Sequence, residues 1–590
     1  MDIEDVGGEL LEEIITNKNN NKQKQKNIVN KTKKKKVNQN KKEEEKDEKN
    51  EKSSSSHNNK RIFVKTFGCS HNASDSEYMI GILAQNGYEI VDNLEDSDLT
   101  IINSCTVKSP SQAAFLNTVT KSKQYNKHVV VGGCVPQAER NLKGLENCSI
   151  VGVSQIDKID YIVKNTFEGN VVRLLENKTL PSLLLPKIRR NKYIEIIPIS
   201  QGCLGSCTYC KTKQARGKLI SYPIKQIVEA CKRAWENNAK ELWVTSEDTA
   251  VYGRDIGTNL PTLMIEILKY VPKDVMIRIG MANPPYILEN INQMIKVLNH
   301  PNVYSFIHIP VQSGSNAVLD KMLREYTIEE FNYLCDRFIE GVPNITIATD
   351  IICGFPSETR ENFEETLNMV EKYKFPVINI SQFYPRPGTV AAKWKKIDTK
   401  EVHYRSKTLA ELFGSYSNYK HLLNTTQRVW VHDTNEEEKN KEENMMVSHN
   451  KSYVKVLIPK DEKLYGKELI VKIRDVYKWH CVGEIIDRNP EPVVVDYNEY
   501  FKDILKQKSI MIENYDNALS HTNNENGDSY SIHDTFNFIK NKKEENGLRK
   551  YKELLNNKKS KFTQIFIINS LNILAFIYLF YSLLKYFKII

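Results

Sequence analysis

Three cysteines, Cys203, Cys207 and Cys210, occur at positions i, i+4 and i+7 of one short segment. Three thiolates on a single loop can hold three irons of a 4Fe–4S cubane and leave the fourth iron open to another ligand. A structural zinc site usually needs four ligands, and a disulfide would leave one thiol over. The spacing therefore predicts a reactive iron–sulfur centre, and three unrelated cysteines are the alternative.

Three further cysteines, Cys69, Cys105 and Cys134, each follow a short strand-like segment. Helical patterns separate these segments, and such alternation indicates a parallel sheet whose ligand crevice lies beyond the carboxyl ends of the strands. We expect the three thiols to share that rim and to hold a second cluster; separate buried cysteines are the alternative. Cys148 lacks the pattern and is predicted to be structural. The strand-like segments are Arg61–Phe67, Leu99–Asn103 and His128–Val131.

Six β/α repeats can be counted after Tyr193, and the first cysteine loop follows the first strand directly. Repeated βα units close into a full or partial barrel with the site at the carboxyl rim of the strands. The cluster loop is therefore predicted to lie on that rim. The predicted strands are Ile194–Ser200, Glu241–Ser246, Val275–Met281, Ser305–Val311, Ile345–Cys353 and Val377–Phe383.

Polar residues at or near the ends of these strands are candidates for contacts to a cofactor bound at the open iron. They are Glu247, Asn283, Gln312 and Asp350, together with Arg324 after a short helix. Strand-end polar groups are often turn caps, and a surface role for the arginine is equally compatible with the sequence. Three other cysteines have apolar neighbours and are assigned to packing: Cys231, Cys335 and Cys353.

Residues 425–487 contain four short strand-like segments, which predict a small β-barrel of the kind that grips RNA. Basic and aromatic side chains alternate along it and suggest a binding patch. The acidic run 436–443 departs from that pattern, and Cys481 is assigned to the core. The strands are Arg428–His432, Tyr453–Ile458, Lys467–Arg474 and Val482–Ile486; the patch is Tyr453, Lys455, Lys460, Lys472, Arg474, Tyr477, Lys478 and Trp479.

Charge and composition vary along the chain, whose formal net charge is +10. Residues 1–60 form a predicted disordered arm rich in Lys and Asn, with a lysine run at 33–36 that could be a nuclear signal or a polyanion tether. The mild basic excess elsewhere permits an anionic partner without requiring one. Eleven cysteines in 590 residues do not resemble a small secreted disulfide scaffold, so a reducing compartment is expected.

The C-terminal segment 562–584 has no charged residue between Lys561 and Lys585. It is long enough to cross a hydrocarbon core of about 30 Å, although Asn569 and Asn572 leave an interfacial helix open. We predict a transmembrane tail anchor that leaves the bulk of the chain in the cytosol, connected through a polar spacer at 488–561. The endoplasmic reticulum membrane is the expected location, with the mitochondrial outer membrane as the alternative.

Many blocks between Arg61 and Ile486 resemble one family. C-x3-C-x2-C after the first strand of a six-unit barrel resembles the radical S-adenosylmethionine enzymes, and an N-terminal domain with three strand-end cysteines resembles their methylthiotransferase branch. Segment 425–487 resembles the TRAM domain of that branch. The blocks closest to its archaeal and eukaryotic members, which modify N6-threonylcarbamoyladenosine in tRNA, include NSCTVKSP, GGCVPQAE, GCLGSCTYCKTKQARG, TSEDTAVYGRDIGTNLPTL and TDIICGFPSET.

The resemblance implies an α/β enzyme with a methylthiotransferase domain at 61–169, a radical S-adenosylmethionine partial (β/α)6 barrel at 193–424 and the TRAM barrel at 425–487. It implies two 4Fe–4S clusters and S-adenosylmethionine. One cluster would generate the radical that abstracts hydrogen from C2 of the modified adenine, and the other would supply sulfur that is then methylated.

The implied substrate is tRNA that reads codons beginning with A and carries the threonylcarbamoyl group, and we expect a monomer. The electron donor and the sulfur donor stay unidentified. The alternatives are methylthiolation of isopentenyladenosine or of a ribosomal protein, and a non-catalytic RNA-binding relative.

Overall fold

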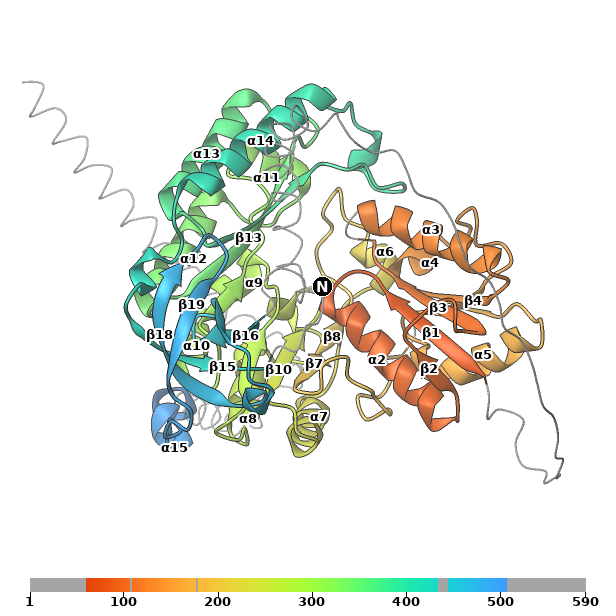
Figure 1. Ribbon diagram of the computed structural model, residues 1–590. Coiled ribbons are helices and arrows are strands. Elements are labelled where there is room, and N and C mark those ends of the chain that lie inside the picture. Colours follow the sequence, from red (N-terminus) through yellow and green to blue (C-terminus); the bar gives the residue numbers. More distant parts are fainter. Residues whose placement is uncertain (1–59, 107–108, 177–178, 433–443, 507–590) are drawn as a thin grey trace, which may run out of the picture. The chain divides into compact units, whose positions relative to one another are not determined.

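The computed structural model describes residues 60–106, 109–176, 179–432 and 444–506 (Figure 1). The predicted arm at 1–60 lies outside this range except for Lys60, as do the acidic run 436–443, most of the spacer and the predicted tail anchor at 562–584. Within the described ranges, no helix combines the length and apolarity needed to cross a membrane. One compact unit extends to Lys502, and the following paragraphs concern that unit.

The N-terminal domain is built on an all-parallel sheet with strand order β2-β1-β3-β4-β5-β6. The three predicted strands form its centre as β1, β3 and β4, whereas β2, β5 and β6 are too short to give a sequence signal. The strands are β1 (Arg61–Thr66), β2 (Glu89–Val91), β3 (Leu99–Ser104), β4 (His128–Gly133), β5 (Ser149–Val151) and β6 (Arg173–Leu174), and the helices are α2 (Ser70–Gln85), α3 (Ser109–Gln124), α4 (Cys134–Ala138) and α5 (Ile159–Phe167).

Apolar side chains cover both faces of this sheet. Ile101 and Val130 point into a core shared with α2 and α5, while Ile102 and Val131 point into a second core shared with α3. Alternate residues of a strand face opposite sides, so a strand buried on both faces reads as a continuous apolar run. Cys148 is fully buried in the second core, in agreement with its predicted structural role.

The second domain contains all six predicted strands in sequential order. Strands β7-β10-β11 and β12-β13-β14 form two parallel sheets, and the Ile277–Val303 bridge joins β11 to the segment before β12. Helices surround these strands in the view of Figure 1. The strands are β7 (Ile194–Pro198), β10 (Glu241–Thr245), β11 (Met276–Ile279), β12 (Phe306–His308), β13 (Thr346–Cys353) and β14 (Val377–Gln382); the main helices are α7 (Ile224–Glu236), α8 (Leu260–Leu268), α10 (Ile291–Asn299), α11 (Asn316–Met322), α12 (Ile328–Gly341), α13 (Arg360–Tyr373) and α14 (Thr399–Ser415).

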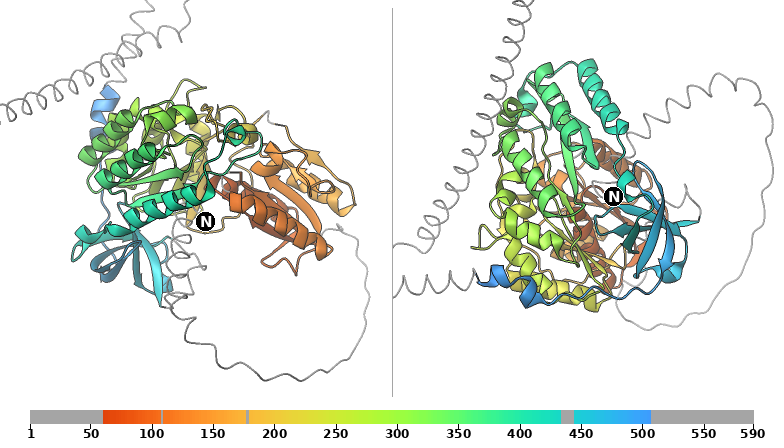
Figure 2. Two further views of the ribbon diagram at one scale, coloured as in Figure 1. Left: turned by 90° about the horizontal axis from the view of Figure 1, so that it is seen from above. Right: turned by 90° about the vertical axis from the view of Figure 1, so that its left-hand side faces the viewer.

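The C-terminal domain is a closed barrel, drawn in blue-green and blue in Figure 2. Its strand order is β15-β16-β17-β19-β18. The small barrel was predicted, but one of its five strands, β16, was missed. That strand follows the acidic run directly and has only three apolar residues before Ser448. Cys481 is buried in the barrel core as expected. The strands are β15 (Thr426–Trp430), β16 (Met445–Asn450), β17 (Lys455–Pro459), β18 (Glu468–Val476) and β19 (Cys481–Asp487).

Aromatic side chains join the barrel to the second domain, and this corrects part of the predicted RNA patch. Tyr453 is only 9% exposed and packs edge-on against Tyr304. The Lys478 ammonium binds the carbonyl oxygen of Tyr416 at 2.9 Å and lies over the rings of Phe413 and Tyr416. Trp479 packs against Phe413 as well. Tyr453, Lys478 and Trp479 therefore hold the domains together.

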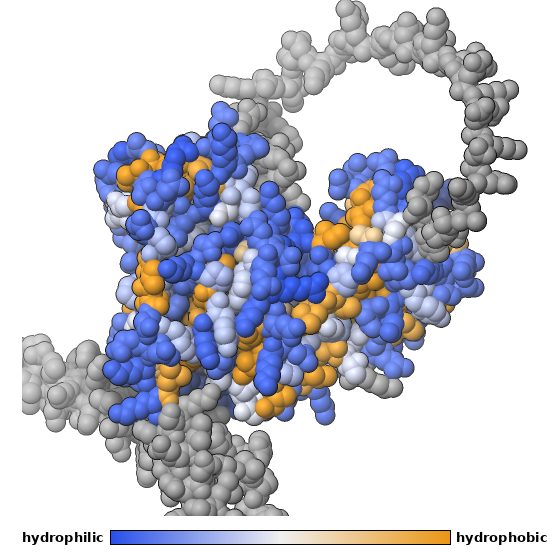
Figure 3. Space-filling model, turned by 90° about the horizontal axis from the view of Figure 1, so that it is seen from below, coloured by the Kyte–Doolittle hydropathy of each residue, from blue (hydrophilic) through white to orange (hydrophobic). Residues whose placement is uncertain are grey.

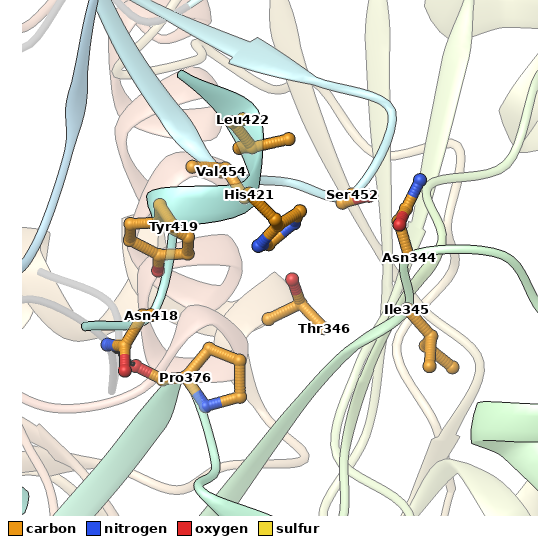
Figure 4. A pocket seen from close by; sticks show the side chains of 10 residues that line it. All are labelled: Asn344, Ile345, Thr346, Pro376, Asn418, Tyr419, His421, Leu422, Ser452 and Val454. Carbon is orange, nitrogen blue, oxygen red and sulfur yellow. Dashed lines mark hydrogen bonds between the residues drawn. The ribbon is translucent and has the colours of Figure 1, made fainter. Parts of the chain in front are cut away.

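A cleft of about 320 Å³ lies at the same junction, and none of the residues that line it is a cysteine of the predicted clusters (Figure 4). Thr346 and Pro376 of the second domain line one side, while Leu422, Ser452 and Val454 line the other. Polar residues dominate the face drawn in Figure 3, where apolar side chains form separate small groups.

Other members of the predicted RNA patch remain exposed. One of them is Tyr477, which is 53% exposed.

Candidate active site

The loop that carries Cys203, Cys207 and Cys210 follows β8 (Ser200–Gln201) and precedes α6 (Thr212–Arg216). A Cβ placed on Gly205 would lie 3.7 Å from the sulfurs of both Cys203 and Cys207, so those sulfurs flank one point and are within twice that distance of each other. All three thiols are partly exposed. Their donor set and convergence fit a cluster held by three thiolates.

Burial shapes the acidity of these thiols. It raises the pKa of Cys203 to about 12, and the nearby Asp248 carboxylate adds to this effect. Burial also raises the pKa of Cys207, although the Arg324 guanidinium opposes the shift. The Cys203 and Cys207 thiols are therefore protonated in the absence of iron, and their binding to a cluster must release protons.

No group of three or more His, Cys, Asp or Glu side chains in the described ranges is arranged to hold a single metal ion. A cubane places each thiolate on a different iron, so its three ligands need not converge on one point. The lack of a single-ion site among the described residues therefore does not bear on whether the cysteine loop can hold a cubane.

A chain of hydrogen bonds leads from the cysteine loop into the barrel rim. Arg324 Nη1 lies 3.5 Å from the sulfur of Cys207, and its Nη2 donates to Asn283 Oδ1. The Asn283 side-chain amide donates to Asp248 Oδ2 at 2.7 Å. Of the five predicted cofactor contacts, Asn283 and Arg324 are thus brought to the Cys207 side of the loop, and Asp248 joins them.

Gln312 and Asp350 lie on the neighbouring strands. Gln312 has a φ of 69° and pairs through its backbone, donating to the Asp350 carbonyl oxygen at 2.8 Å. The Asp350 carboxylate lies 2.9 Å from His308 Nε2 and accepts from Asn379 at 2.8 Å. Asp350 is therefore already held by two side chains, and its contact with a cofactor stays a prediction, as does that of Gln312.

The second set of cysteines lies where three strands of the N-terminal sheet end. Cys69 is the residue before α2, Cys105 follows β3, and Cys134 begins α4. A hydrogen bond with the Cys105 thiol, together with burial, raises the pKa of Cys69 well above its usual value. Gly68 is needed at this point, because its φ is +107° and an added Cβ would lie 2.2 Å from the Cβ of Cys105. Burial also raises the pKa of Cys134 to about 11.

A cluster of buried polar side chains connects the two cysteine sites, and we call it the buried bridge. Arg216 Nη2 donates to Asp75 Oδ2 at 2.6 Å and to Asn72 Oδ1 at 2.7 Å, and its Nε lies 3.4 Å from the sulfur of Cys134. His71 Nδ1 lies 2.9 Å from Glu247 Oε1. The members of the buried bridge are His71, Asn72, Asp75, Arg216 and Glu247.

Glu247 is held by protein partners on both carboxylate oxygens, and its contact with a cofactor stays a prediction. Its Oε2 accepts from the backbone N–H of Gly202 at 2.8 Å, and its Oε1 faces His71 and Arg216. Burial would raise the pKa of Glu247, but His71 and Arg216 outweigh it and hold the pKa below its usual value. Burial likewise lowers the pKa of His71 while Glu247 raises it, with a net increase. The carboxylate thus supports the cysteine loop from behind.

Sequence reasoning missed four members of the buried bridge. His71, Asn72 and Asp75 belong to a polar run at the start of α2, where a solvated helix face would be the ordinary reading. Arg216 ends the short helix after the cysteine loop. The available signal was proximity in sequence, because each of the four lies within six residues of a predicted cluster ligand.

Two family descriptions match the chain. Residues 61–151 match the family described as uncharacterized protein family UPF0004, and residues 197–370 match the radical SAM superfamily. The range 61–151 contains Cys69, Cys105 and Cys134, and the range 197–370 contains Cys203, Cys207 and Cys210.

Curated relatives match most of the chain. The threonylcarbamoyladenosine tRNA methylthiotransferase of Homo sapiens is 48% identical over 432 residues, covering 72% of this chain and 74% of the relative. That of Xenopus laevis is 49% identical, covering 72% and 77%. The protein named probable threonylcarbamoyladenosine tRNA methylthiotransferase in Pyrococcus horikoshii is 34% identical and is covered over 99% of its length.

Solved structures are more distant. The radical S-adenosylmethionine methyltransferase TsrM from Kitasatospora setae aligns with a TM-score of 0.43 and 13% identity, covering 57% of this chain and 75% of that one. At this level of similarity its ligands have no bearing on the present chain.

Proposed function

Because the chain belongs to the threonylcarbamoyladenosine tRNA methylthiotransferases, we propose that it adds a methylthio group to C2 of N6-threonylcarbamoyladenosine in tRNA. The identity extends over 432 residues, and the two family matches, at 61–151 and 197–370, contain the two sets of cysteines. The radical SAM match at 197–370 supports the type of chemistry. A tRNA is the substrate, and the small C-terminal barrel is the candidate module for gripping it.

We further propose that the chain holds two 4Fe–4S clusters, one at Cys203, Cys207 and Cys210 and the other at Cys69, Cys105 and Cys134. The observation behind this proposal is that each group of three thiols gathers at strand ends, and that the buried bridge joins the two groups. When bound, S-adenosylmethionine and the clusters supply the radical, the sulfur and the methyl group that an unactivated aromatic C–H bond requires.

The chain's own residues hold and orient the reacting groups. Arg324 and Asn283 fix the Cys207 side of the loop, and their polar atoms are the best placed of the predicted residues for contact with S-adenosylmethionine. Glu247 fixes the other side through the Gly202 amide. Rigid support of this kind keeps reacting atoms in a productive geometry and excludes water.

Iron and sulfide analysis after anaerobic reconstitution tests the two-cluster proposal. The unaltered chain should carry roughly eight irons, and Cys69→Ala and Cys203→Ala should each carry roughly four. Cys148→Ala, which removes a buried thiol of the apolar core, is the matched control and should keep the full count. Four irons in the unaltered chain, with no change in Cys69→Ala, would refute the second cluster.

Mass spectrometry of tRNA nucleosides tests the substrate. Depletion of the protein should remove the methylthio derivative of N6-threonylcarbamoyladenosine, and restoring the chain should return it. Loss of the methylthio isopentenyladenosine nucleoside instead would favour the alternative substrate. An unchanged nucleoside profile would favour a non-catalytic RNA-binding protein.

We also propose that the segment 562–584 anchors the enzyme to a membrane, with the endoplasmic reticulum ahead of the mitochondrial outer membrane. This proposal is based on the uncharged run alone and concerns residues outside the described ranges. Deleting residues 562–590 should release the enzyme into the soluble fraction. Retention of the truncated chain in membranes would show that the tail is not the anchor.

A further inference from the structure

Arg216 combines deep burial with an unused hydrogen-bond donor. Only 2% of the residue is exposed, and it is one of the largest fully buried side chains of the described chain. Its Nη1 has no hydrogen-bond partner among the described residues. A guanidinium is always charged and is costly to bury, so an N–H of this group that has no partner calls for an explanation.

The contacts of Arg216 reach elements of both domains. The residue ends α6 in the second domain, six positions after Cys210. It donates to Asp75 and Asn72 on α2, and its Nε points to the sulfur of Cys134 at the start of α4. It also lies 3.5 Å from Glu247 after β10. One side chain thus touches the supports of both cysteine sites.

Charge explains why a guanidinium suits this position. Three thiolates and a cluster carry net negative charge, and N–H groups donated to the sulfurs are among the factors that set a cluster's reduction potential. Reduction adds a negative charge, so a cation beside the sulfur stabilises the reduced form. A simple ion pair between the domains would need only Asp75 and would leave the contact with Cys134 incidental.

We propose that Arg216 is a positioning residue which locks the two cysteine sites together and donates N–H groups to sulfur at the Cys69, Cys105 and Cys134 site. Its Nε–H donates to the Cys134 sulfur, and its unpartnered Nη1 can donate to another sulfur of the cluster bound there. The second half of this proposal depends on the two-cluster function, whereas the first half concerns the protein alone.

Hydrogen exchange of the metal-free, full-length chain tests the first half. Arg216→Gln should speed exchange of both the loop 202–217 and the first turns of α2, since the residue ties these segments together. Arg405→Gln is the matched control, because Arg405 is 3% exposed, close to the 2% of Arg216, and pairs with a buried carboxylate, Glu358, at 2.7 Å. Exchange in Arg216→Gln that is no faster at either segment than in Arg405→Gln would overturn the locking role.

Redox titration tests the second half in a chain that lacks the other cluster through Cys203→Ala, Cys207→Ala and Cys210→Ala. Arg216→Gln should lower the equilibrium constant for reduction of the remaining cluster at least tenfold. For one electron this corresponds to a shift of the reduction potential by about 59 mV in the negative direction. Arg405→Gln should leave the potential unchanged. An unchanged potential in Arg216→Gln, with an unchanged iron content, would overturn the donation to sulfur.

A variant that retains the charge keeps both tests possible if Arg216→Gln does not fold. Arg216→Lys keeps the positive charge but cannot reach Asp75, Asn72 and Cys134 at once, so it should show a smaller shift in potential and the same faster exchange. If Arg216→Gln does not fold, Arg216→Lys is used for both measurements. Exchange no faster than in Arg405→Gln would then overturn the locking role, and an unchanged potential with an unchanged iron content would overturn the donation to sulfur. Absence of any cluster in the triple-alanine parent would refute the two-cluster function itself, and the exchange experiment would still decide the locking role.

Discussion

Mild acid should loosen the junction between the second domain and the C-terminal barrel, because buried histidines there must stay neutral. His300 ends α10, is 4% exposed and packs against Phe501. Burial, with the nearby Lys451 charge, lowers its pKa from the usual 6.5 to about 4. His449 on β16 stacks on Tyr453, and burial lowers its pKa to about 3.

The sign and size of the effect follow from proton linkage. Below the unfolded pKa of 6.5, the unfolded chain takes up a proton that folded His300 refuses until the pH falls to about 4. Stability is therefore complete above pH 6.5 and is lost progressively between 6.5 and about 4. Between about pH 7.5 and 5.5 the loss should be about 1.3 kcal/mol for His300, and about as much for His449.

Urea unfolding of the metal-free chain, followed by tryptophan fluorescence, measures this loss. Trp430 is 5% exposed at the same junction and packs against Tyr304, so its emission reports on the contact. His300→Asn keeps a side-chain acceptor for the backbone N–H of Asn302. Its free energy of unfolding should fall by about 1.3 kcal/mol less than that of the unaltered chain over the same pH change.

His403→Asn, on the exposed side of α14, is the control and should keep the full pH dependence. If His300→Asn loses as much stability between about pH 7.5 and 5.5 as the unaltered chain, the reasoning from buried neutral histidine is refuted.

Three further changes test separate parts of the structure. Gly202→Ala should abolish iron binding at the Cys203 loop, because its φ is +85° and an added Cβ would lie 2.2 Å from a backbone carbonyl oxygen; Gly257→Ala, with a φ of +72° and nothing within 4 Å, should keep its iron. Glu241→Ala should lower the free energy of unfolding by about 3–5 kcal/mol, since a buried carboxylate there satisfies three side-chain donors, and a loss below about 1 kcal/mol in urea unfolding would contradict this. Tyr477→Ala should weaken tRNA binding by about 1–3 kcal/mol through lost base stacking. Tyr404→Ala, on α14 and 60% exposed against 53% for Tyr477, should not, and equal filter-binding constants for both variants would exclude a role for Tyr477.

The strand ends and their cysteines were predictable from the sequence because local patterns specify them. Apolar runs in parallel strands are long enough to recognise, and the residue that follows each run falls at one edge of the sheet by geometry. All six strands of the second domain and the three central strands of the first were found in this way. Strands of two or three residues, such as β5 and β6, gave no signal because a pattern needs more positions to repeat.

Side-chain partners were much harder to predict. Lys478 and Tyr453 have the residue types of an RNA contact, and only the docked barrel shows that they face the second domain. Asp75 and Arg216 read as ordinary polar helix residues, yet they pair across a domain boundary 141 residues apart in sequence. Residue type indicates what a group can bind, whereas tertiary packing decides which partner it meets.

The two surfaces of the second domain that meet other domains differ in a way that bears on function. Toward the C-terminal barrel the contact contains Tyr304, Phe306, Trp430 and Tyr453, which is the usual composition of a stable apolar interface. Toward the N-terminal domain, beside the cysteines, the contact is made by the buried bridge and by the Lys211–Glu139 pair. Buried ion pairs seldom add more stability than apolar groups of the same size would. On the proposal that the chain holds two clusters, a fixed charge that reaches a sulfur atom, such as Arg216 beside Cys134, positions an anionic centre and influences its potential. The polar contact then follows from the proposed chemistry between the domains, and the apolar contact from stability.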